Sequence, residues 1–416
     1  MNYKATRDFA LSLDRNDGLS KYRNQFHIPL QKNGKEHIYF CGNSLGLQPK
    51  KTKEFIDQEI NDWATLGVEG HLNAKNPWLP YHESLSQSYA NIVGSKKSEV
   101  VAMNTLTVNL HLMMVSFYRP TSKRYKIVIE ADAFPSDTYA VESQIKFHGF
   151  SLEKSLIKIK PRAGESALRT EDIIDVINKE GDEISLIMLG GVNYYTGQVF
   201  DFEEITKSAH SKAILVGFDL AHAVGNIKLE LHNWHVDFAV WCSYKYLNSG
   251  PGSVGGAFIH EKHHNSDMPR FSGWWGHNKE DRFDMPDNFN PIKSAEGWQL
   301  SNPPILSLAA IRASLSFFEE VGMQKLVAKS KGLNKYFLYL LNSIDSDRIE
   351  IITPKNSGCQ ISIKVINGNK DLFEKITNEG VIADWREPDV IRVAPVPLYN
   401  SYLDLYGFYK ILKQLL

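Results

Sequence analysis

The sequence predicts an α/β fold with two domains, a large one built on a mostly parallel sheet and a smaller α/β one at the C-terminal end. Between about residues 98 and 259, apolar runs alternate with helical segments, a pattern typical of a parallel sheet covered by helices on both faces. After Asn302-Pro303-Pro304 the pattern changes to a helical stretch, 305–321, and then to short strands and helices. We therefore expect a domain boundary near residue 305.

The predicted strands of the large domain follow one another as apolar runs along the chain. They are V-V-A-M, Y-K-I-V-I-E, I-S-L-I-M-L, A-I-L-V-G-F-D, D-F-A-V-W and V-G-G-A-F-I. In the small domain we expect strands near 349–352, 360–365 and 391–393, and helices over 370–379 and 401–416. The predicted division is an N-terminal segment that packs on the small domain, a large domain and a small domain, over residues 1–50, 51–305 and 306–416.

The composition indicates a globular protein that acts on a small molecule. Of the 416 residues 43% are hydrophobic and 23% charged, and the net charge is −1, so no long-range field favours nucleic acid or an anionic membrane. The three cysteines lack close paired spacing, which predicts reduced thiols, and no secretory signal is visible. The most apolar helical run, 106–118, is too short to cross a bilayer. We expect a cytoplasmic protein.

One aspartate and one lysine each follow a predicted strand. The run V-G-F-D ends in Asp219, and a second run leads to Lys245, 26 residues later. Because open α/β sheets bind ligands at the carboxyl ends of their strands, we expect both side chains at one site. A carboxylate there can keep a pyridine nitrogen protonated, and a lysine can form a Schiff base with an aldehyde. Each residue alone also fits an ordinary surface or turn position, but the joint pattern indicates pyridoxal 5′-phosphate as the cofactor.

Three further segments suit other parts of this cofactor. Residues 104–107 lie where a strand leads into a helix, so their free backbone N–H groups can bind a phosphate. Phe134, in F-P-S-D, follows another strand and can stack on a pyridine ring. His222, three residues after Asp219, can hydrogen-bond Asp219 or the ring oxygen O3′. Taken singly, each segment also fits a helix cap or a first helical turn.

The segment 270–300 is long, polar and rich in aromatic side chains, among them Trp274, Trp275 and Trp298. Loops of this length without their own secondary structure are usually functional or covered by a partner. Aromatic residues are also enriched at subunit interfaces. We therefore expect a homodimer with its site at the interface.

Motifs along nearly the whole chain resemble those of kynureninases, which are fold-type I pyridoxal phosphate enzymes. From Phe40 to Ser401 they are F-C-G-N-S-L-G-L, N-x-L-T-V-N-L-H-L, F-P-S-D, G-V-N-Y-Y-T-G-Q, G-F-D-L-A-H-A-V-G-N, W-C-S-Y-K-Y-L-N, G-W-W-G-H, S-N-P-P and I-R-V-A-P-V-P-L-Y-N-S. The resemblance implies a fold-type I transferase-like fold. It also implies hydrolysis of the Cβ–Cγ bond of L-kynurenine or 3-hydroxy-L-kynurenine to L-alanine and anthranilate or 3-hydroxyanthranilate.

The resemblance implies a role for each matching residue. Lys245 would be the Schiff-base lysine that moves the Cα proton, Asp219 the partner of the ring nitrogen, and Tyr244 a further proton carrier. The other cofactor-binding residues would be Leu106, Thr107, Phe134, Pro135, Ser136, Asp137, His222, Tyr244, Trp274 and Asn302. The substrate-binding residues would be Asn43, Ser44, His71, Trp275, Asn302 and Arg392, of which Arg392 would bind the substrate α-carboxylate. No metal is implied.

One position departs from the family pattern, and two others bear on the substrate. The family can carry a serine just before the G-V segment, but this chain has Gly190, so a water or another donor must make that cofactor contact. His71 and Asn302 resemble the pair found in family members that favour the 3-hydroxy substrate, with Trp275 at the neighbouring aromatic position. A site that hydrogen-bonds the extra hydroxyl can discriminate strongly, so we expect 3-hydroxykynurenine to be favoured.

Other motifs suggest competing hypotheses. The G-x-G-x-x-G match at 250–255 leads into a strand-like run, whereas a dinucleotide site needs a helix there. The zinc peptidase motif His260-Glu261-x-x-His264 follows a strand and soon meets a proline, whereas zinc ligation needs a sustained helix. A cysteine desulfurase would use Cys359, which instead enters an apolar run and is expected to be buried. A non-catalytic binding protein is disfavoured because the aspartate and lysine are both present.

Overall fold

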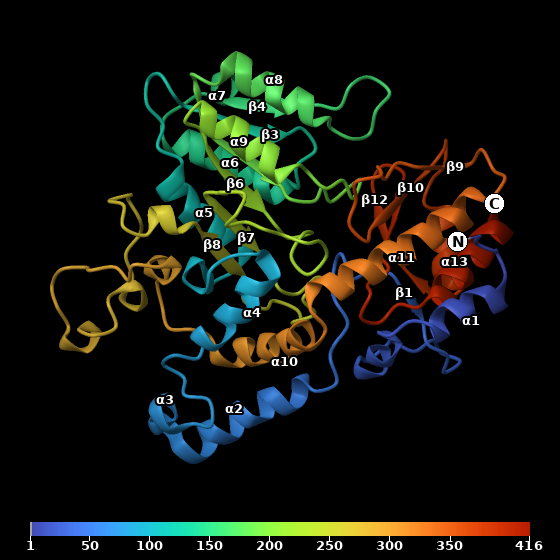
Figure 1. Ribbon diagram of the computed structural model, residues 1–416, viewed down its shortest axis with the longest axis horizontal. Coiled ribbons are helices and arrows are strands. Elements are labelled where there is room, and N and C mark those ends of the chain that lie inside the picture. Colours follow the sequence, from blue (N-terminus) through green and yellow to red (C-terminus); the bar gives the residue numbers. More distant parts are fainter. Residues whose placement is uncertain (1) are drawn as a thin grey trace.

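Residues 2–416 are described by a computed structural model in which the chain forms two lobes (Figure 1). The large lobe contains the long sheet and most of the helices. The small lobe contains a second sheet and both ends of the chain, which lie close together at the far side of the molecule (Figure 1). The α/β architecture with a large, mostly parallel sheet and a smaller C-terminal sheet is therefore confirmed.

Within residues 2–416 the large sheet has seven strands in the order β2-β8-β7-β6-β5-β3-β4. Neighbours from β4 to β7 run parallel, whereas β8 runs antiparallel to both β7 and β2. The strand bounds are β2 Val100–Ala102, β3 Lys126–Glu130, β4 Leu156–Ile159, β5 Ile184–Gly190, β6 Leu215–Asp219, β7 Phe238–Trp241 and β8 Gly256–Ile259.

Helices cover both faces of this sheet, and the strand residues alternate between the two faces. Val128 and Ile187 pack into the core under α8 and α9, whereas Ile127 and Leu186 pack into the core under α5 and α6. The helices of this lobe are α2 Thr52–Leu66, α3 Gly70–Asn73, α4 Glu83–Val93, α5 Leu106–Phe117, α6 Pro135–Phe147, α7 Leu152–Ser155, α8 Thr170–Glu180, α9 Phe202–Ser211 and α10 Ile305–Val321.

The small lobe is built on an antiparallel sheet in the order β12-β13-β10-β9. Its helices and strands are α11 Met323–Asn342, β9 Ile349–Ile351, β10 Ile361–Val365, α12 Asp371–Asn378, β11 Val381–Ile382, β12 Asp384–Arg386, β13 Val390–Val393 and α13 Tyr402–Leu415. The N-terminal segment lies on this lobe, because α1 (Arg7–Arg15) packs on α13 and β1 (Ile38–Tyr39) pairs in parallel with β11.

The helix α10 departs from the division expected near residue 305. It packs against α2 and α4, and its side chains Leu308, Ile311 and Leu315 belong to the core of the large lobe. The change in sequence pattern at Pro303-Pro304 therefore marks the start of a helix in the large lobe, and the chain crosses to the small lobe along α11 (Figure 1). None of the helices in the described part of the chain has the length and apolar character needed to span a membrane.

Candidate active site

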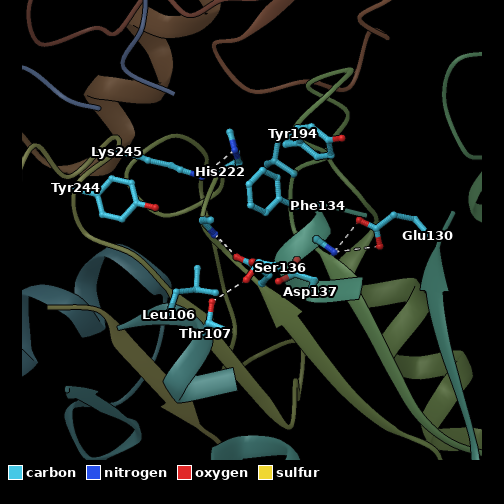
Figure 2. Close-up of a pocket in the computed structure, with 14 residues that line it drawn as sticks. Leu106, Thr107, Glu130, Phe134, Ser136, Asp137, Tyr194, His222, Tyr244 and Lys245 are labelled. Atoms are coloured by element: carbon cyan, nitrogen blue, oxygen red, sulfur yellow. Dashed lines mark hydrogen bonds between the residues drawn. The ribbon is translucent and has the colours of Figure 1, made fainter. Parts of the chain in front are cut away.

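A cavity of about 140 Å³ opens at the carboxyl ends of the central strands, the edge at which the sequence predicts a ligand. Glu130, Gly190 and Asp219 are the last residues of β3, β5 and β6, and all three line this cavity. The other lining residues are Leu106, Thr107, Phe134, Ser136, Asp137, Val192, Tyr194, Ala221, His222, Tyr244 and Lys245 (Figure 2).

Asp219 is oriented by its own turn. The backbone N–H of Ala221 donates to Oδ1 of Asp219 at 2.6 Å, and the side chain is only 7% exposed. Burial raises the pKa of Asp219. Asp137, beside it, has a pKa well above the ordinary value because of burial and then the charge of Asp219, and within residues 2–416 its buried Oδ1 has no hydrogen-bond partner. The carboxyl groups of Asp219 and Asp137 therefore lie where they can bind a cationic or N–H donor of a ligand.

Lys245 follows β7 and points into the cavity toward His222. Its Nζ lies 3.0 Å from Nε2 of His222 (Figure 2) and 5.9 Å from the centroid of the Phe134 ring. Burial, and then the charge of Lys245, hold the pKa of His222 well below its ordinary value, so the imidazole is neutral at pH 7 and can accept a hydrogen bond from the lysine.

Two helix N-termini meet at one end of the cavity. Oγ1 of Thr107, in the first turn of α5, lies 2.8 Å from Oγ of Ser136, in the first turn of α6 (Figure 2). Neither helix has a side-chain cap, because Thr105 and Phe134 at the two N-cap positions make no capping hydrogen bond. Free N–H groups, two hydroxyl groups and two positive helix ends therefore converge, which suits a phosphate.

Aromatic side chains border the space between this phosphate end and Lys245. Phe134 and Tyr194 meet edge to face, with ring centroids 5.3 Å apart and an interplanar angle of 84°. The flat ring of Phe134 faces the space that Lys245 and Asp219 border, so the expected stacking of a pyridine ring on it is sterically reasonable. The donor set fits pyridoxal phosphate: an amine for the aldehyde, carboxyl groups for the ring nitrogen and N–H groups for the phosphate.

The comparisons with known proteins agree with this chemistry. Residues 326–412 match the family model described as the kynureninase C-terminal domain. The kynureninase of Koribacter versatilis is 54% identical over 410 residues, covering 98% of this chain and 97% of that protein, and the kynureninase of Mus musculus is 47% identical over 429 residues, covering 98% and 92%. The chain belongs to the kynureninase family. It is therefore a pyridoxal phosphate-dependent hydrolase that acts on a carbon–carbon bond.

Solved structures of low sequence identity share the fold. An apo cysteine desulfurase from Thermococcus onnurineus has a TM-score of 0.76 at 18% identity, covering 95% of this chain and 97% of that one. A C-DES variant with glycine covalently linked to its pyridoxal phosphate has a TM-score of 0.77 at 14% identity, covering 94% and 98%. These likenesses confirm the predicted fold-type I architecture.

Three residues expected at the substrate do not line the cavity themselves, but they belong to segments that contact residues lining it. Arg392, on β13, is 1% exposed, donates from Nη1 to the carbonyl of Tyr194 at 2.6 Å and pairs with Asp384. Asn43 and Ser44 belong to the N-terminal segment, which passes along the lysine where Gly46 N donates to the carbonyl of Tyr244 at 2.8 Å. The fold thus brings β13 and the N-terminal segment to the strand ends.

Five other expected residues do not line the cavity. Pro135 is the first residue of α6. His71 lies on α3 against Trp78, with ring centroids 5.5 Å apart, while Trp274 donates to the carbonyl of Arg282 at 3.1 Å. Trp275 is buried within its own loop, and Asn302 is exposed. The expected roles of His71, Trp274, Trp275 and Asn302 stay predictions that need a second chain.

Glu130 and Tyr194 line the cavity but were not singled out from the sequence. Tyr194 lies inside the motif G-V-N-Y-Y-T-G-Q, so its place in a family motif was the available signal. Glu130 ends the apolar run Y-K-I-V-I-E as Asp219 ends V-G-F-D. The same strand-then-acid pattern could therefore have identified it.

The competing motifs have ordinary structural roles. Residues 250–255 form the turn before β8, and Glu261–His263 is a single 3-10 turn in which Nδ1 of His260 accepts from the N–H of Lys262. Nitrogens of His260 and His232 do lie near a carboxylate oxygen of Glu99, but the two rings stack with an interplanar angle of 13°. Their in-plane lone pairs therefore lie in two separate, nearly parallel planes and do not converge on one ion.

Proposed function

We propose that this chain hydrolyses the Cβ–Cγ bond of L-kynurenine and, in preference, of 3-hydroxy-L-kynurenine, releasing L-alanine and the corresponding anthranilate. It would act as a cytoplasmic homodimer whose second subunit completes each site. One observation carries the proposal: Lys245, Asp219 and Tyr194 line one cavity, and Arg392 donates a hydrogen bond to the backbone carbonyl of Tyr194. An amine, a ring-nitrogen partner and a carboxylate-binding guanidinium are the groups that this reaction on an amino acid requires.

Each of these side chains has a task that follows from its chemistry. Pyridoxal phosphate, when bound, supplies an electron-withdrawing ring that stabilises negative charge on the substrate Cα. Asp219 keeps the ring nitrogen protonated, and Lys245 takes and returns protons at Cα. Burial raises the pKa of Tyr244, so its hydroxyl stays protonated at pH 7 and can donate to the leaving group. Burial lowers the pKa of Arg392 to about 10, so at pH 7 its guanidinium remains cationic and binds the α-carboxylate.

Exposed apolar side chains support the homodimer. Around α2, α3 and the 270–300 loop they include Trp63, Val68, Leu72, Phe271, Trp274, Phe283 and Met285. Such side chains favour an interface with another chain, and α3 and this loop lie on the same side of the large lobe (Figure 1). Within residues 2–416 the buried Nδ1 of His71 has no hydrogen-bond partner, which supports a partner from outside the chain, such as the 3-hydroxyl group.

Comparative kinetics test the reaction and the preference. Alanine and anthranilate release from kynurenine and from its 3-hydroxy form should give a higher kcat/KM for the 3-hydroxy form. The double variant His71→Ala, Asn302→Ala should lose that preference by about 10-fold or more while keeping activity on kynurenine. Equal efficiency of the native enzyme on both substrates would refute the preference without affecting the reaction.

Subunit complementation tests the shared site. Chains carrying Lys245→Ala and chains carrying the His71, Asn302 double change would be co-expressed and assayed on the 3-hydroxy substrate. If each site needs both subunits, mixed dimers have one intact site, and about one quarter of the native activity should return. A monomer in analytical ultracentrifugation, or no recovery in proven mixed dimers, would overturn the shared site.

A further inference from the structure

Glu130 is a buried carboxyl group in the cavity that the reaction described above does not use. It is 4% exposed, and within residues 2–416 it forms no salt bridge. Its two oxygens lie 3.1 and 3.3 Å from the backbone nitrogen of Gly190 (Figure 2). Because that nitrogen carries one hydrogen, one carboxyl oxygen accepts it well and the other has little compensation.

Glu130 lies beside residue 190, where this chain has a glycine and the family can carry a serine. A Cβ atom built on Gly190 would lie 3.0 Å from Oε1 of Glu130, tighter than nearly all such contacts. The carboxyl group therefore occupies the space beside the strand ends that a serine side chain on residue 190 would approach. A cofactor contact from that position must come from another donor, and Glu130 is the polar side chain closest to it.

The surroundings of Glu130 favour its neutral form. Burial, with smaller contributions from the charges of Asp219 and Asp132, raises the pKa of Glu130 to about 7. Asp137 also lines the cavity, and the charge of Glu130 contributes to the raised pKa of its carboxyl group, so each of these two acids disfavours ionisation of the other. A protonated carboxyl group keeps one oxygen as acceptor for Gly190 N–H and gains an O–H donor on the other.

We propose that Glu130 is a cofactor-binding residue that, as a neutral carboxylic acid, donates a hydrogen bond to the ring oxygen O3′ of bound pyridoxal phosphate in place of a side chain on residue 190. The inference depends on the cofactor and not on the choice of substrate. The Glu130 side chain would then have two roles that differ in their need for a proton. The carboxyl group can accept a hydrogen bond from Gly190 N–H in either form, but it can donate one to the cofactor only when it is protonated.

Cofactor affinity measured against pH tests the donor role. The Kd of pyridoxal phosphate for the apoenzyme would be compared for the native chain and Glu130→Gln, whose amide donates at every pH. We expect similar values at pH 6 and about 10-fold weaker binding by the native chain at pH 9, where its carboxyl group has lost the proton. All other groups are the same in the two proteins, so the ratio of the native Kd to the variant Kd reports on residue 130.

The proposal would be overturned if the ratio of the native Kd to the Glu130→Gln Kd stayed near one or fell as the pH rose. A carboxylate that only accepts from the N–H of Gly190 becomes a better acceptor on ionisation, so it would not weaken cofactor binding at high pH. The control Asp175→Asn removes an exposed carboxyl group on α8, away from the cavity, and should leave the native pH dependence in place.

A rescue variant distinguishes donation from structural support. Glu130→Ala should weaken pyridoxal phosphate binding about 10-fold at pH 6 and alter the visible absorbance of the bound cofactor. Alanine at residue 130 leaves room for a side chain at residue 190. Adding Gly190→Ser should therefore restore the binding affinity and the absorbance toward their native values. Circular dichroism of each apoenzyme checks folding. Failure of the serine to rescue a folded protein would count against a donor at this position, while retained visible absorbance would show that the cofactor assignment itself stands.

Discussion

The Nζ atom of Lys245 lies 3.0 Å from Nε2 of His222, so in the free protein the neutral imidazole accepts a hydrogen bond from the lysine. The two residues come from different strand ends, because His222 follows β6 and Lys245 follows β7. The parallel pairing of β6 and β7 sets this approach and aims the amine at the space between Phe134 and Asp219. The predictions below follow from this arrangement and from the polar groups around it.

Replacing Lys245 by alanine should abolish covalent attachment of pyridoxal phosphate and lower kcat by roughly 10²–10⁴-fold, because both the anchor and the proton carrier are lost. Borohydride reduction followed by peptide mass analysis would locate the attachment in the native chain. The matched control Lys325→Ala changes an exposed lysine on α11 and should keep both properties. Native turnover by the Lys245 variant would contradict the site.

Arg392→Lys should raise KM by about 10–100-fold and change kcat much less. A lysine retains the charge but loses the bidentate fork that binds a carboxylate. Steady-state kinetics with kynurenine would measure the two parameters separately. A fall in kcat at unchanged KM would mean that the guanidinium acts in the chemical step instead.

Cys359→Ala should leave anthranilate release within about twofold of native. The thiol is 1% exposed, and burial raises its pKa to about 12, so it supplies no thiolate nucleophile at pH 7. In the native state Cys359 should also resist a thiol reagent that labels it after unfolding. Loss of activity on this substitution in a folded protein would revive the desulfurase hypothesis.

Asp237→Ala should destabilise the protein by about 3–5 kcal/mol at pH 7, because several donors would lose a buried partner. The carboxylate of Asp237 is fully buried and accepts from Val216 N at 2.7 Å, His210 Nε2 at 2.9 Å and His263 Nε2 at 2.8 Å, with Lys262 Nζ at 2.7 Å. Urea unfolding measures the effect. Asp175→Asn, on the exposed face of α8, is the control and should cost less than about 0.5 kcal/mol.

The contribution of Asp237 should also depend on pH. Burial alone would raise the pKa of Asp237, but hydrogen bonds from His210 and His263 hold it far below the ordinary value of 3.8. A lowered pKa stabilises the fold above the ordinary value and ceases to do so as the pH falls through the folded-state value. The difference between native and variant should therefore keep its full size from pH 7 to about pH 5 and shrink only as the pH falls below about 4. Because Asp237 precedes β7 and Lys245 follows it, kcat of the folded variant should be unchanged.

The local pattern was sufficient for much of the fold. The apolar runs ending at Glu130 and Asp219 contain strands that end at those residues, and the helix predicted over 305–321 is α10. The short strands β11 and β12 were not predicted, because two or three residues of mixed polarity show no clear alternation. The boundary near residue 305 was drawn from a change in pattern, but the lobe to which α10 belongs depends on which helices it packs against.

By itself the sequence determined which chemical groups stand at strand ends: Asp219 and Lys245 follow buried apolar runs, and this pattern is local. Only the tertiary structure decided that the N-terminal segment contacts Tyr244 beside Lys245, that Arg392 on β13 contacts Tyr194, and that Glu130 lies against Gly190. Those contacts join residues from 60 to 198 positions apart. Their physical origin is the packing of two lobes and the order β3-β5-β6-β7, which no short stretch of sequence encodes.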